Sequence, residues 1–356
     1  MPAVPNPVLS PASYAQGAVP RVLIVDDSAV ARAALARVIG ESARFTVAAT
    51  APTAEIALDV LRQETVDFIL LDLELPGTNG IVALPSLLAA GKGAKILVVS
   101  GSVATGAAAT VEALALGAAD TLEKPLAGGI AGRFGETLLA KLDAIAAPAH
   151  DVRSAPRIAP RPARRFDAIA IGASTGGIHA LSVVLDAIPA EMRQPIFVTQ
   201  HLPESFSTYF AAQVATAARR PCAVAADRTR IMPGAVLVAP GDAHLVAVPL
   251  PEHAAAARLS REPAPTTNMP SVDPMLSSLA AIYRDRLLAI VLTGMGRDGL
   301  IGARAVRAAG GTILVQDRET SVVWGMPGAI AGEGLAHAVL TPRQIGAYIA
   351  ANGVGA

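Results

Sequence analysis

A serine stands between glycines in the stretch DAIAIGASTGG, directly after a run of small and apolar residues. Residues Gly172–Gly176 fit the pattern G-x-S-x-G, in which a sharp strand-to-helix turn raises a serine hydroxyl above a sheet. The stretch could instead bind a phosphate, but it lacks G-x-G-x-x-G and the lysine of G-x-x-x-x-G-K-[ST]. The motif therefore favours a nucleophilic Ser174 over a nucleotide loop, with a purely structural turn as the simpler alternative.

A serine nucleophile needs a base, and the chain has six histidines. His201 ends the apolar run PIFVTQ and is the best candidate, although a single histidine at a strand end is often structural. Asp298, in AIVLTGMGRDG, could hold the imidazole tautomer and stabilise the imidazolium. The order Ser174, His201, Asp298 differs from that of α/β hydrolases and indicates another fold with a convergent triad. His244, after APGD, is a candidate binding residue in a loop.

Acidic and hydroxyl residues end the apolar runs of the first third of the chain. Asp26 and Asp27 follow RVLIV, Asp72 follows FILL, Ser100 ends ILVVS and Lys124 follows DTLE. On a parallel sheet these positions share one edge, where three carboxylates repel unless a cation lies among them. Mg²⁺ suits such oxygen ligands, and a carboxylate can be the nucleophile in phosphoryl transfer. Each aspartate alone could merely cap a helix, but the full ordered set favours phosphate chemistry.

Two blocks of alternating apolar runs and helical patterns must carry these residues. Residues 20–147 contain RVLIVDD, FTVAAT, VDFILLDL, AKILVVSGS and ADTLEKP, which predict a doubly wound, five-stranded parallel sheet. Residues 166–356 contain DAIAIGAS, QPIFVTQH, GAVLVAPG, LAIVLTGMG and GTILVQD, which predict a second α/β domain. The Pro/Arg-rich residues 148–165 are expected to form an extended linker, and residues 1–19 a disordered leader.

The composition excludes several classes of function. With 29 basic and 29 acidic side chains among 356 residues, there is no electrostatic case for binding nucleic acid or an anionic membrane. No apolar run is long enough to span a bilayer, and the N-terminus does not resemble a signal peptide. The only cysteine, Cys222, cannot form an internal disulfide and is expected to be a buried, inert thiol. We expect a cytoplasmic protein without membrane insertion.

The first block resembles a response-regulator receiver domain, through its acidic pair, single aspartate, Ser/Thr and Lys-Pro in that order. The resemblance implies that Asp72 is the phosphoacceptor, Ser100 the switch hydroxyl and Lys124 the phosphate-binding lysine. It implies a histidine kinase as phosphodonor and Mg²⁺ for phosphorylation. The implied metal ligands are Asp26, Asp27, Asp72 and the carbonyl of Glu74. Two positions depart from the pattern: Asn79, where receivers usually carry aspartate, and Thr121, where an aromatic residue is common.

The second block resembles the chemotaxis protein-glutamate methylesterase family, through IGASTGG, TQHLP, APGDAHL, NMPSVD, VLTGMGRDG, GGTILVQD and SVVWGMPGAI. The resemblance implies a Rossmann-like domain with a mainly parallel sheet. Ser174 would be the nucleophile, His201 the base and Asp298 its partner, with oxyanion N–H groups at Thr175 and Met295. The implied reaction demethylates glutamate methyl esters and deamidates glutamines on chemotaxis receptors, with no cofactor for the hydrolytic step. NMPSVD lacks the basic residue that often precedes PSVD in the family.

One regulatory block joined to one enzyme suggests that the receiver covers the Ser174 cleft and that phosphorylation of Asp72 relieves this. Two other classes of function are weaker. A non-enzymatic response regulator would be favoured by loss of a triad residue, and all three residues are present. A nucleotide-binding protein would need a phosphate-loop lysine, which the motif lacks.

Overall fold

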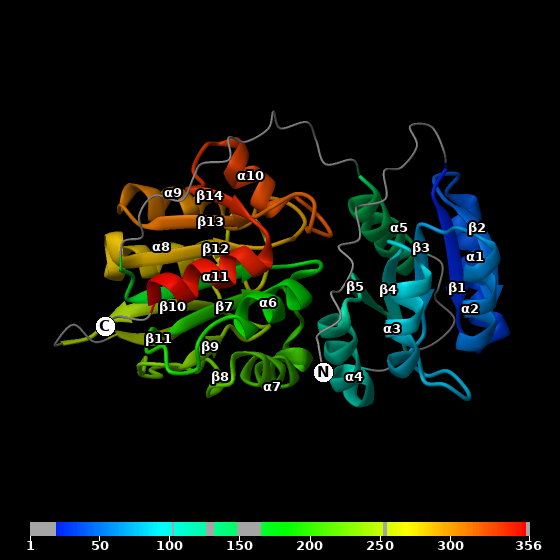
Figure 1. Cartoon of the computed structure of the whole chain (residues 1–356), viewed down its shortest axis with the longest axis horizontal. Coiled ribbons are helices and arrows are strands. Elements are labelled where there is room, and N and C mark those ends of the chain that lie inside the picture. Colours follow the sequence, from blue (N-terminus) through cyan, green and yellow to red (C-terminus); the bar gives the residue numbers. More distant parts are fainter. Residues whose placement is uncertain (1–18, 102, 126–131, 148–164, 252–254, 354–356) are drawn as a thin grey trace, which may run out of the picture. The chain divides into compact units, whose positions relative to one another are not determined.

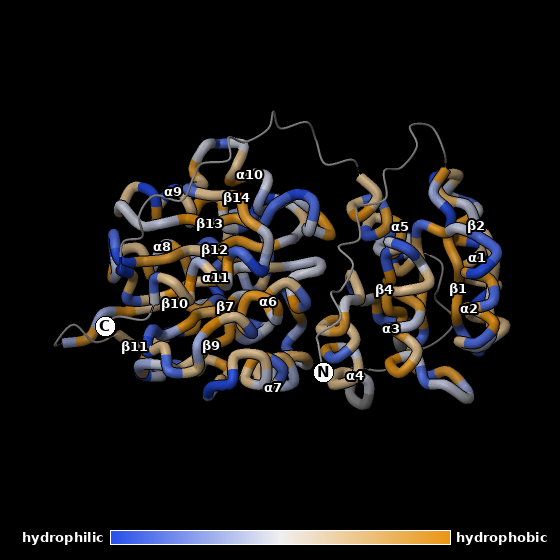
Figure 2. The backbone as a smooth tube through the Cα atoms, in the orientation of Figure 1, coloured by the Kyte–Doolittle hydropathy of each residue, from blue (hydrophilic) through white to orange (hydrophobic). Residues whose placement is uncertain are grey.

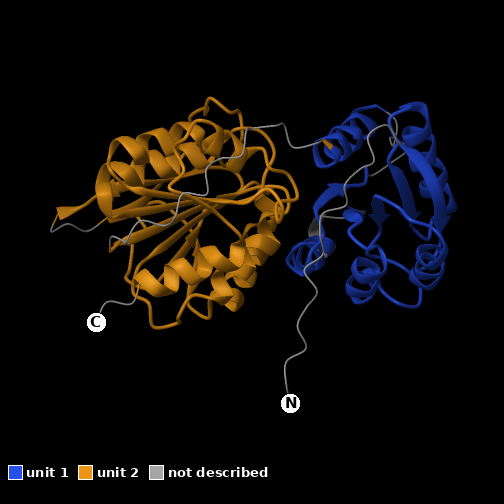
Figure 3. Cartoon of the chain, turned by 45° about the horizontal axis from the view of Figure 1, so that its top comes forward, with its two compact units in different colours: residues 1–146 blue, residues 147–356 orange. Residues whose placement is uncertain are grey.

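The computed structural model describes residues 19–101, 103–125, 132–147, 165–251 and 255–353. The chain divides into two compact units, residues 1–146 and 147–356, which are coloured separately in Figure 3. The predicted leader, residues 1–19, and the predicted linker, residues 148–165, both lie outside the described residues except for the last position of each.

The first unit contains a five-stranded parallel sheet in the order β2-β1-β3-β4-β5 (Figure 1). The strands are β1 Arg21–Val25, β2 Thr46–Ala51, β3 Phe68–Leu71, β4 Lys95–Ser100 and β5 Asp120–Glu123. The helices are α1 Ala29–Glu41, α2 Ala54–Gln63, α3 Gly80–Ala90, α4 Val103–Leu116 and α5 Arg133–Ala146. The predicted doubly wound sheet is confirmed. The direction of winding reverses between β1 and β3, so the residues after these two strands meet at the edge where such sheets bind ligands.

The second unit contains a seven-stranded sheet in the order β14-β13-β12-β6-β7-β9-β8, in which every paired strand is parallel. These strands are β6 Ala168–Ala173, β7 Ile196–Gln200, β8 Cys222–Val224, β9 Val236–Val238, β12 Leu287–Val291, β13 Thr312–Gln316 and β14 Ala338–Leu340. Beside the sheet, β10 (His244–Pro249) and β11 (Ala255–Ser260) form an antiparallel hairpin. The mainly parallel α/β prediction is confirmed.

Helices cover both faces of this sheet (Figure 3). Their bounds are α6 Gly177–Asp186, α7 Ser207–Ala218, α8 Val272–Tyr283, α9 Leu300–Ala308, α10 Met326–Gly332 and α11 Pro342–Gly353, with short 3₁₀ turns η1 Glu204–Phe206 and η3 Arg284–Arg286. Helix α8 packs on α9, and α6 packs on α7 and α11. Because the sheet is covered on both sides, all six residues of β6 are buried, and the central strands are mostly orange in Figure 2.

The topology singles out one position in the second unit. Strand β6 pairs with β7 on one side and with β12 on the other, so the winding reverses at β6. A crevice outside the carboxyl ends of the strands opens at such a reversal and is the usual ligand site of open α/β sheets. Ser174 is the first residue after β6. No helix in the described part of the chain is long and apolar enough to cross a membrane.

Candidate active site and phosphorylation site

Ser174 lies in a tight turn between β6 and α6. Its N–H donates to the carbonyl of Thr293 (3.0 Å), and its own carbonyl accepts from the N–H of Gly177 (2.7 Å) and from Nε2 of Gln200 (2.9 Å). Gly176 has φ +76°, where only glycine is unstrained, and a Cβ there would come within 2.4 Å of Val322. The glycine pattern therefore serves a sharp turn that fixes the backbone of Ser174.

A second loop, residues 293–298, passes directly beside the serine. A Cβ on Gly294 would lie 2.7 Å from the Cβ of Ser174 and 2.4 Å from the sulfur of Met326, so only glycine allows this approach. Oγ1 of the buried Thr293 donates to the carbonyl of Thr175 (2.9 Å), which ties the loop to the turn. Thr175 and Met295 are the two positions predicted for the oxyanion hole. Thr175 follows Ser174 in the turn, and Met295 follows Gly294 in the loop that passes beside it.

The predicted triad residues come together in the structure. Nδ1 of His201 lies 3.1 Å from Oγ of Ser174, and Nε2 lies 2.7 Å from Oδ2 of Asp298. The backbone N–H of His201 donates to the carbonyl of Ala173 (3.2 Å), the residue before the serine. The His201 side chain is 16% exposed and Asp298 is fully buried. The imidazole therefore lies between a half-buried serine and a buried carboxylate, which is the connectivity of a serine-histidine-aspartate triad, with the two ring nitrogens exchanged relative to the chymotrypsin arrangement.

Asp298 is held as a carboxylate by its surroundings. Burial alone would raise the pKa of Asp298, but the hydrogen bonds from His201 and from the N–H of Val272 (2.8 Å) outweigh it, and its pKa lies well below the usual range. The hydroxyl of Ser271 also donates to Asp298 (2.7 Å). A carboxylate that stays charged can fix the imidazole tautomer and stabilise the imidazolium that forms during catalysis.

Two sequence-based interpretations of other residues can be compared with the structure. His244 begins β10 and is 1% exposed, with both ring nitrogens hydrogen-bonded to the backbone of Ser271 and Glu262, so the interpretation of a loop residue that binds a ligand is wrong. Burial raises the pKa of Cys222 to about 12, which keeps the thiol protonated at neutral pH and makes it a poor nucleophile. Polar side chains that support the triad, such as Ser271 and Thr293, carried no chemical signal of their own in the sequence.

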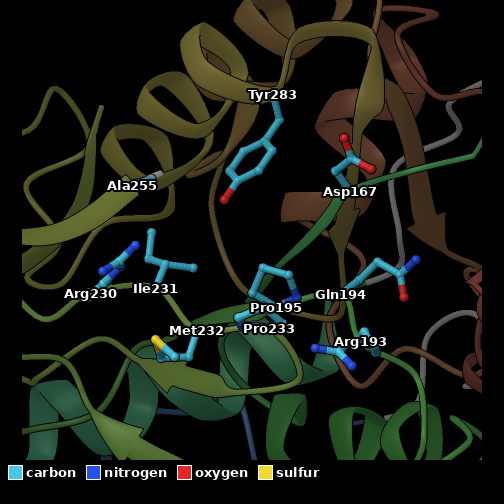
Figure 4. Close-up of a pocket in the computed structure, with 10 residues that line it drawn as sticks. All are labelled: Asp167, Arg193, Gln194, Pro195, Arg230, Ile231, Met232, Pro233, Ala255 and Tyr283. Carbon is cyan, nitrogen blue, oxygen red and sulfur yellow. The ribbon is translucent and has the colours of Figure 1, made fainter. Parts of the chain in front are cut away.

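A pocket of about 660 Å³ lies elsewhere in this unit (Figure 4). Asp167 and Pro195, two of its lining residues, directly precede β6 and β7. The pocket is therefore at the amino ends of the strands, whereas Ser174 and His201 follow the carboxyl ends. It contains none of the triad residues and is not the reaction site.

The three aspartates of the first unit also converge. Carboxylate oxygens of Asp26, Asp27 and Asp72 all lie within 4.8 Å of one another, with Asp26 and Asp72 buried and Asp27 exposed. Nζ of Lys124 lies 2.7 Å from Oδ2 of Asp26 and 2.6 Å from Oδ2 of Asp72. The N–H of Glu74 donates to Oδ1 of Asp72 (3.2 Å). Three carboxylates at this spacing, one of them open to solvent, fit the hard oxygen ligands that Mg²⁺ takes.

Lys124 offsets part of the negative charge of this cluster. Burial would lower the pKa of Lys124, but its hydrogen bonds to Asp26 and Asp72 outweigh the burial and raise it. Ser100 ends β4, and its side chain lies outside the described part of the structure. The metal-binding carbonyl of Glu74 and the switch role of Ser100 remain predictions. Asn79 caps α3 through the N–H of Ile81 (2.9 Å), which gives this departure from the receiver pattern a structural role.

Comparison with known proteins assigns a family to each of the two units. Residues 169–349 match the family model "CheB methylesterase", and residues 22–129 match "Response regulator receiver domain". A protein-glutamate methylesterase/protein-glutamine glutaminase of Maricaulis maris is 38% identical, over 95% of this chain and 96% of the relative.

A second such protein, from Caulobacter vibrioides, is 41% identical over 93% of this chain and 98% of its own length. The crystal structure of the Thermotoga maritima CheB methylesterase catalytic domain aligns with a TM-score of 0.51 and 34% identity, covering 53% of this chain and 99% of that domain. The chain therefore belongs to the CheB methylesterase family and carries a response regulator receiver domain ahead of its methylesterase domain.

Proposed function

We propose that the chain is a phosphorylation-activated serine hydrolase that demethylates glutamate methyl esters, and deamidates glutamines, on chemotaxis receptors. The observation that carries this proposal is the hydrogen-bonded series Ser174, His201, Asp298 at the winding reversal of the sheet. Its membership in a family whose relatives are named protein-glutamate methylesterase/protein-glutamine glutaminase supports the substrate class. The receiver domain supports control by phosphorylation.

Acylation begins at Ser174. Its Oγ attacks the γ-carbonyl carbon of the methylated glutamate while Nδ1 of His201, 3.1 Å away, takes the hydroxyl proton. The resulting imidazolium is stabilised by the buried carboxylate of Asp298 at Nε2. Collapse of the tetrahedral intermediate breaks the bond to the methoxy oxygen, which receives the proton from His201 and leaves as methanol. The product is a γ-glutamyl ester on Ser174.

The negative charge of the tetrahedral intermediate needs donors beside Ser174. We assign this role to the backbone N–H groups of Thr175 and Met295, which belong to the two segments that approach the serine most closely. Loss of one such donor typically costs a factor of about 100 to 1000 in kcat. The hydrogen bond from the Thr293 hydroxyl to the carbonyl of Thr175 would hold the turn and the loop together. Both N–H donors would then keep their positions during the reaction.

Deacylation uses the same groups in reverse order. A water takes the place of methanol, gives its proton to His201 and attacks the acyl carbon, after which Ser174 recovers its proton and glutamate is released. For a glutamine substrate the first leaving group is ammonia instead of methanol, and the product is again glutamate. One set of residues therefore accounts for both activities.

Regulation is assigned to the aspartate cluster of the receiver domain. A carboxylate oxygen of Asp72 would attack the phosphoryl group of a phosphohistidine on a histidine kinase, giving an acyl phosphate on Asp72. Asp26, Asp27, Asp72 and the carbonyl of Glu74 would hold Mg²⁺, which would offset the charge on the phosphoryl oxygens. Lys124, now bonded to Asp26 and Asp72, would move to a phosphoryl oxygen, and Ser100 would respond to the new charge. A cytoplasmic location would give access to both kinase and receptor.

The direct test is methanol release from methylated receptor by the full chain, with and without acetyl phosphate as phosphodonor. The parent protein should release methanol and respond to the phosphodonor, and Ser174→Ala should lose activity by roughly 10⁵- to 10⁶-fold. Ser182→Ala is the matched control, because that serine lies on the neighbouring helix α6 and its hydroxyl donates to the carbonyl of Ile178 within the same helix. Methanol release by Ser174→Ala at more than a few percent of the parent rate would refute the proposal.

A further inference from the structure

The carboxylate of Asp298 is held by more donors than its role toward His201 requires. Its Oδ2 accepts from Nε2 of His201 (2.7 Å) and the N–H of Val272 (2.8 Å). Its Oδ1 accepts from the hydroxyl of Ser271 (2.7 Å) and the N–H of Gly299 (2.9 Å). The donors on Oδ1 fix the rotation of the carboxylate, and therefore the direction in which Oδ2 faces the imidazole. Among the described residues, Thr266 also donates a hydroxyl hydrogen bond to Oδ1 (3.2 Å), and Ser271 is the shorter of the two side-chain donors.

Ser271 itself is tightly held. It is fully buried at the N-cap of α8, where its hydroxyl also accepts from the N–H of Asp273 (3.3 Å). Its backbone N–H donates to Nδ1 of His244 (2.9 Å). The hydroxyl therefore joins the start of α8 to Asp298, and the backbone joins the same point to the hairpin that contains His244.

His244 has no freedom to change its hydrogen bonds. Nδ1 accepts from Ser271, so the ring proton must be on Nε2, which donates to the carbonyl of Glu262 (2.9 Å). His244 is 1% exposed and begins strand β10, outside the main sheet. Its two ring hydrogen bonds anchor the N-terminus of α8 to this strand.

We propose that Ser271 is a positioning residue for the triad and that His244 anchors it, in the series Glu262 carbonyl, His244, Ser271, Asp298, His201. This inference rests on the proposed function, because it assumes that Asp298 orients His201 for Ser174. It has a chemical consequence beyond packing. The Ser271 hydroxyl neutralises part of the charge on Asp298, and without it more of that charge acts on the imidazolium.

The test measures the nucleophile directly, in the full chain, with a fluorophosphonate probe. This probe phosphonylates Oγ of Ser174: the oxygen–phosphorus bond forms, fluoride leaves, and His201 takes the serine proton. Ser271→Ala should slow labelling by roughly 10- to 100-fold, the size expected if misorientation of the imidazole removes the energy of one hydrogen bond to a charged group from the transition state. The acid limb of its labelling rate against pH should move to higher pH, because the less neutralised Asp298 favours the imidazolium. Ser271→Thr, which keeps the hydroxyl, should restore most of the rate.

Two controls separate positioning from stability. Thr53→Ala removes another N-cap hydroxyl, one that accepts from the N–H of Ile56 in the first unit, and should lower the melting temperature without slowing labelling. His244→Asn keeps an acceptor that can reach the N–H of Ser271, whereas His244→Leu does not, so the Leu variant should label more slowly than the Asn variant.

Each outcome has a distinct meaning. Absence of both labelling and methanol release in the parent, with acetyl phosphate present, would refute the proposed function itself. A parent that labels while folded Ser271→Ala labels at the same rate, with the same pH dependence, would refute only the positioning role. If Ser271→Ala does not fold, the variants His244→Asn and His244→Leu test the inference instead. Equal labelling rates in these two variants would overturn it.

Discussion

Both units place an aspartate beside a nitrogen at the carboxyl ends of parallel strands, and the two aspartates have opposite tasks. Asp72 is 5% exposed and accepts from Nζ of Lys124 and the N–H of Glu74. Asp298 is fully buried and accepts from His201, Ser271, Val272 and Gly299. In the proposed function, the receiver carboxylate must react, whereas the hydrolase carboxylate must only hold a histidine.

The two aspartates differ in whether a carboxylate oxygen is available to act as a nucleophile. The side-chain donor to Asp72 is a lysine, which can shift to a phosphoryl oxygen once the carboxylate is modified. Asp298 is surrounded by the hydroxyls of Ser271 and Thr266, by backbone N–H groups and by the imidazole of His201, so neither oxygen is available for attack. The same residue type becomes a nucleophile or an orienting group according to how many fixed donors surround it.

The substitution Asp298→Asn should have the largest effect and tests whether Asp298 has a special role toward His201. The amide keeps the shape of the carboxylate but favours the wrong imidazole tautomer and cannot stabilise the imidazolium, so kcat for methanol release should fall by about 10⁴-fold. Asp273→Asn, the same change at the second residue of α8, serves as the control and should cost far less. Comparable losses in the two variants would mean that Asp298 has no special relation to His201.

The corresponding change in the receiver is Asp72→Asn. An amide cannot form the acyl phosphate, so acetyl phosphate should no longer stimulate methanol release, and the ratio of stimulated to unstimulated rate should fall to about one. Asp67→Asn is the matched control, because Asp67 lies at the opposite end of β3, where it accepts from the N–H of Arg21 (2.7 Å). Full stimulation of the Asp72 variant would remove this residue from the regulatory step.

A smaller effect should follow from Mg²⁺. Binding among the three receiver carboxylates stabilises that unit by about 2 to 3 kcal/mol when Mg²⁺ is present at 100 times its dissociation constant. The melting temperature of the receiver transition, followed by calorimetry, should therefore rise with Mg²⁺ and fall back with a chelator. Asp27→Asn should abolish the increase, whereas Asp59→Asn, an exposed aspartate paired with Arg62, should retain it. An increase that persists in the Asp27 variant would place the metal elsewhere.

The sequence predicts both sheets and the main site residues because these features are local. Each strand is a short apolar run, and each reactive side chain stands at the end of one, so the parallel topology alone brings Ser174 and His201 to the same edge. The supporting residues are different. Ser271 and His244 join α8 to a hairpin outside the sheet, and a buried serine or histidine has no spacing that reveals its partner. Their contacts depend on tertiary packing, which the sequence pattern does not specify.

The smallest expected effect is the change in stability with pH that Asp273 causes. Asp273 is a second buried aspartate close to Asp298, but its carboxylate has fewer donors. Its Oδ1 accepts from the N–H of Gly302 (2.7 Å), and its buried Oδ2 has no hydrogen-bond partner among the described residues. Burial and the nearby charge of Asp298 raise the pKa of Asp273 to about 6, from 3.8 for an ordinary aspartate. The protein therefore disfavours the charged form of Asp273, whereas it favours the charged form of Asp298.

A carboxyl whose pKa is higher in the folded state binds protons more tightly there, so folding is favoured at low pH and loses stability as the pH rises through the two pKa values. Between about pH 4 and pH 7 the parent should lose roughly 1 to 2 kcal/mol of unfolding free energy relative to Asp273→Asn, which cannot ionise. Denaturant unfolding of both proteins at several pH values measures this difference. A difference that does not change with pH would show that Asp273 is as well solvated as an exposed aspartate, and the contrast between the two neighbouring carboxylates would then disappear.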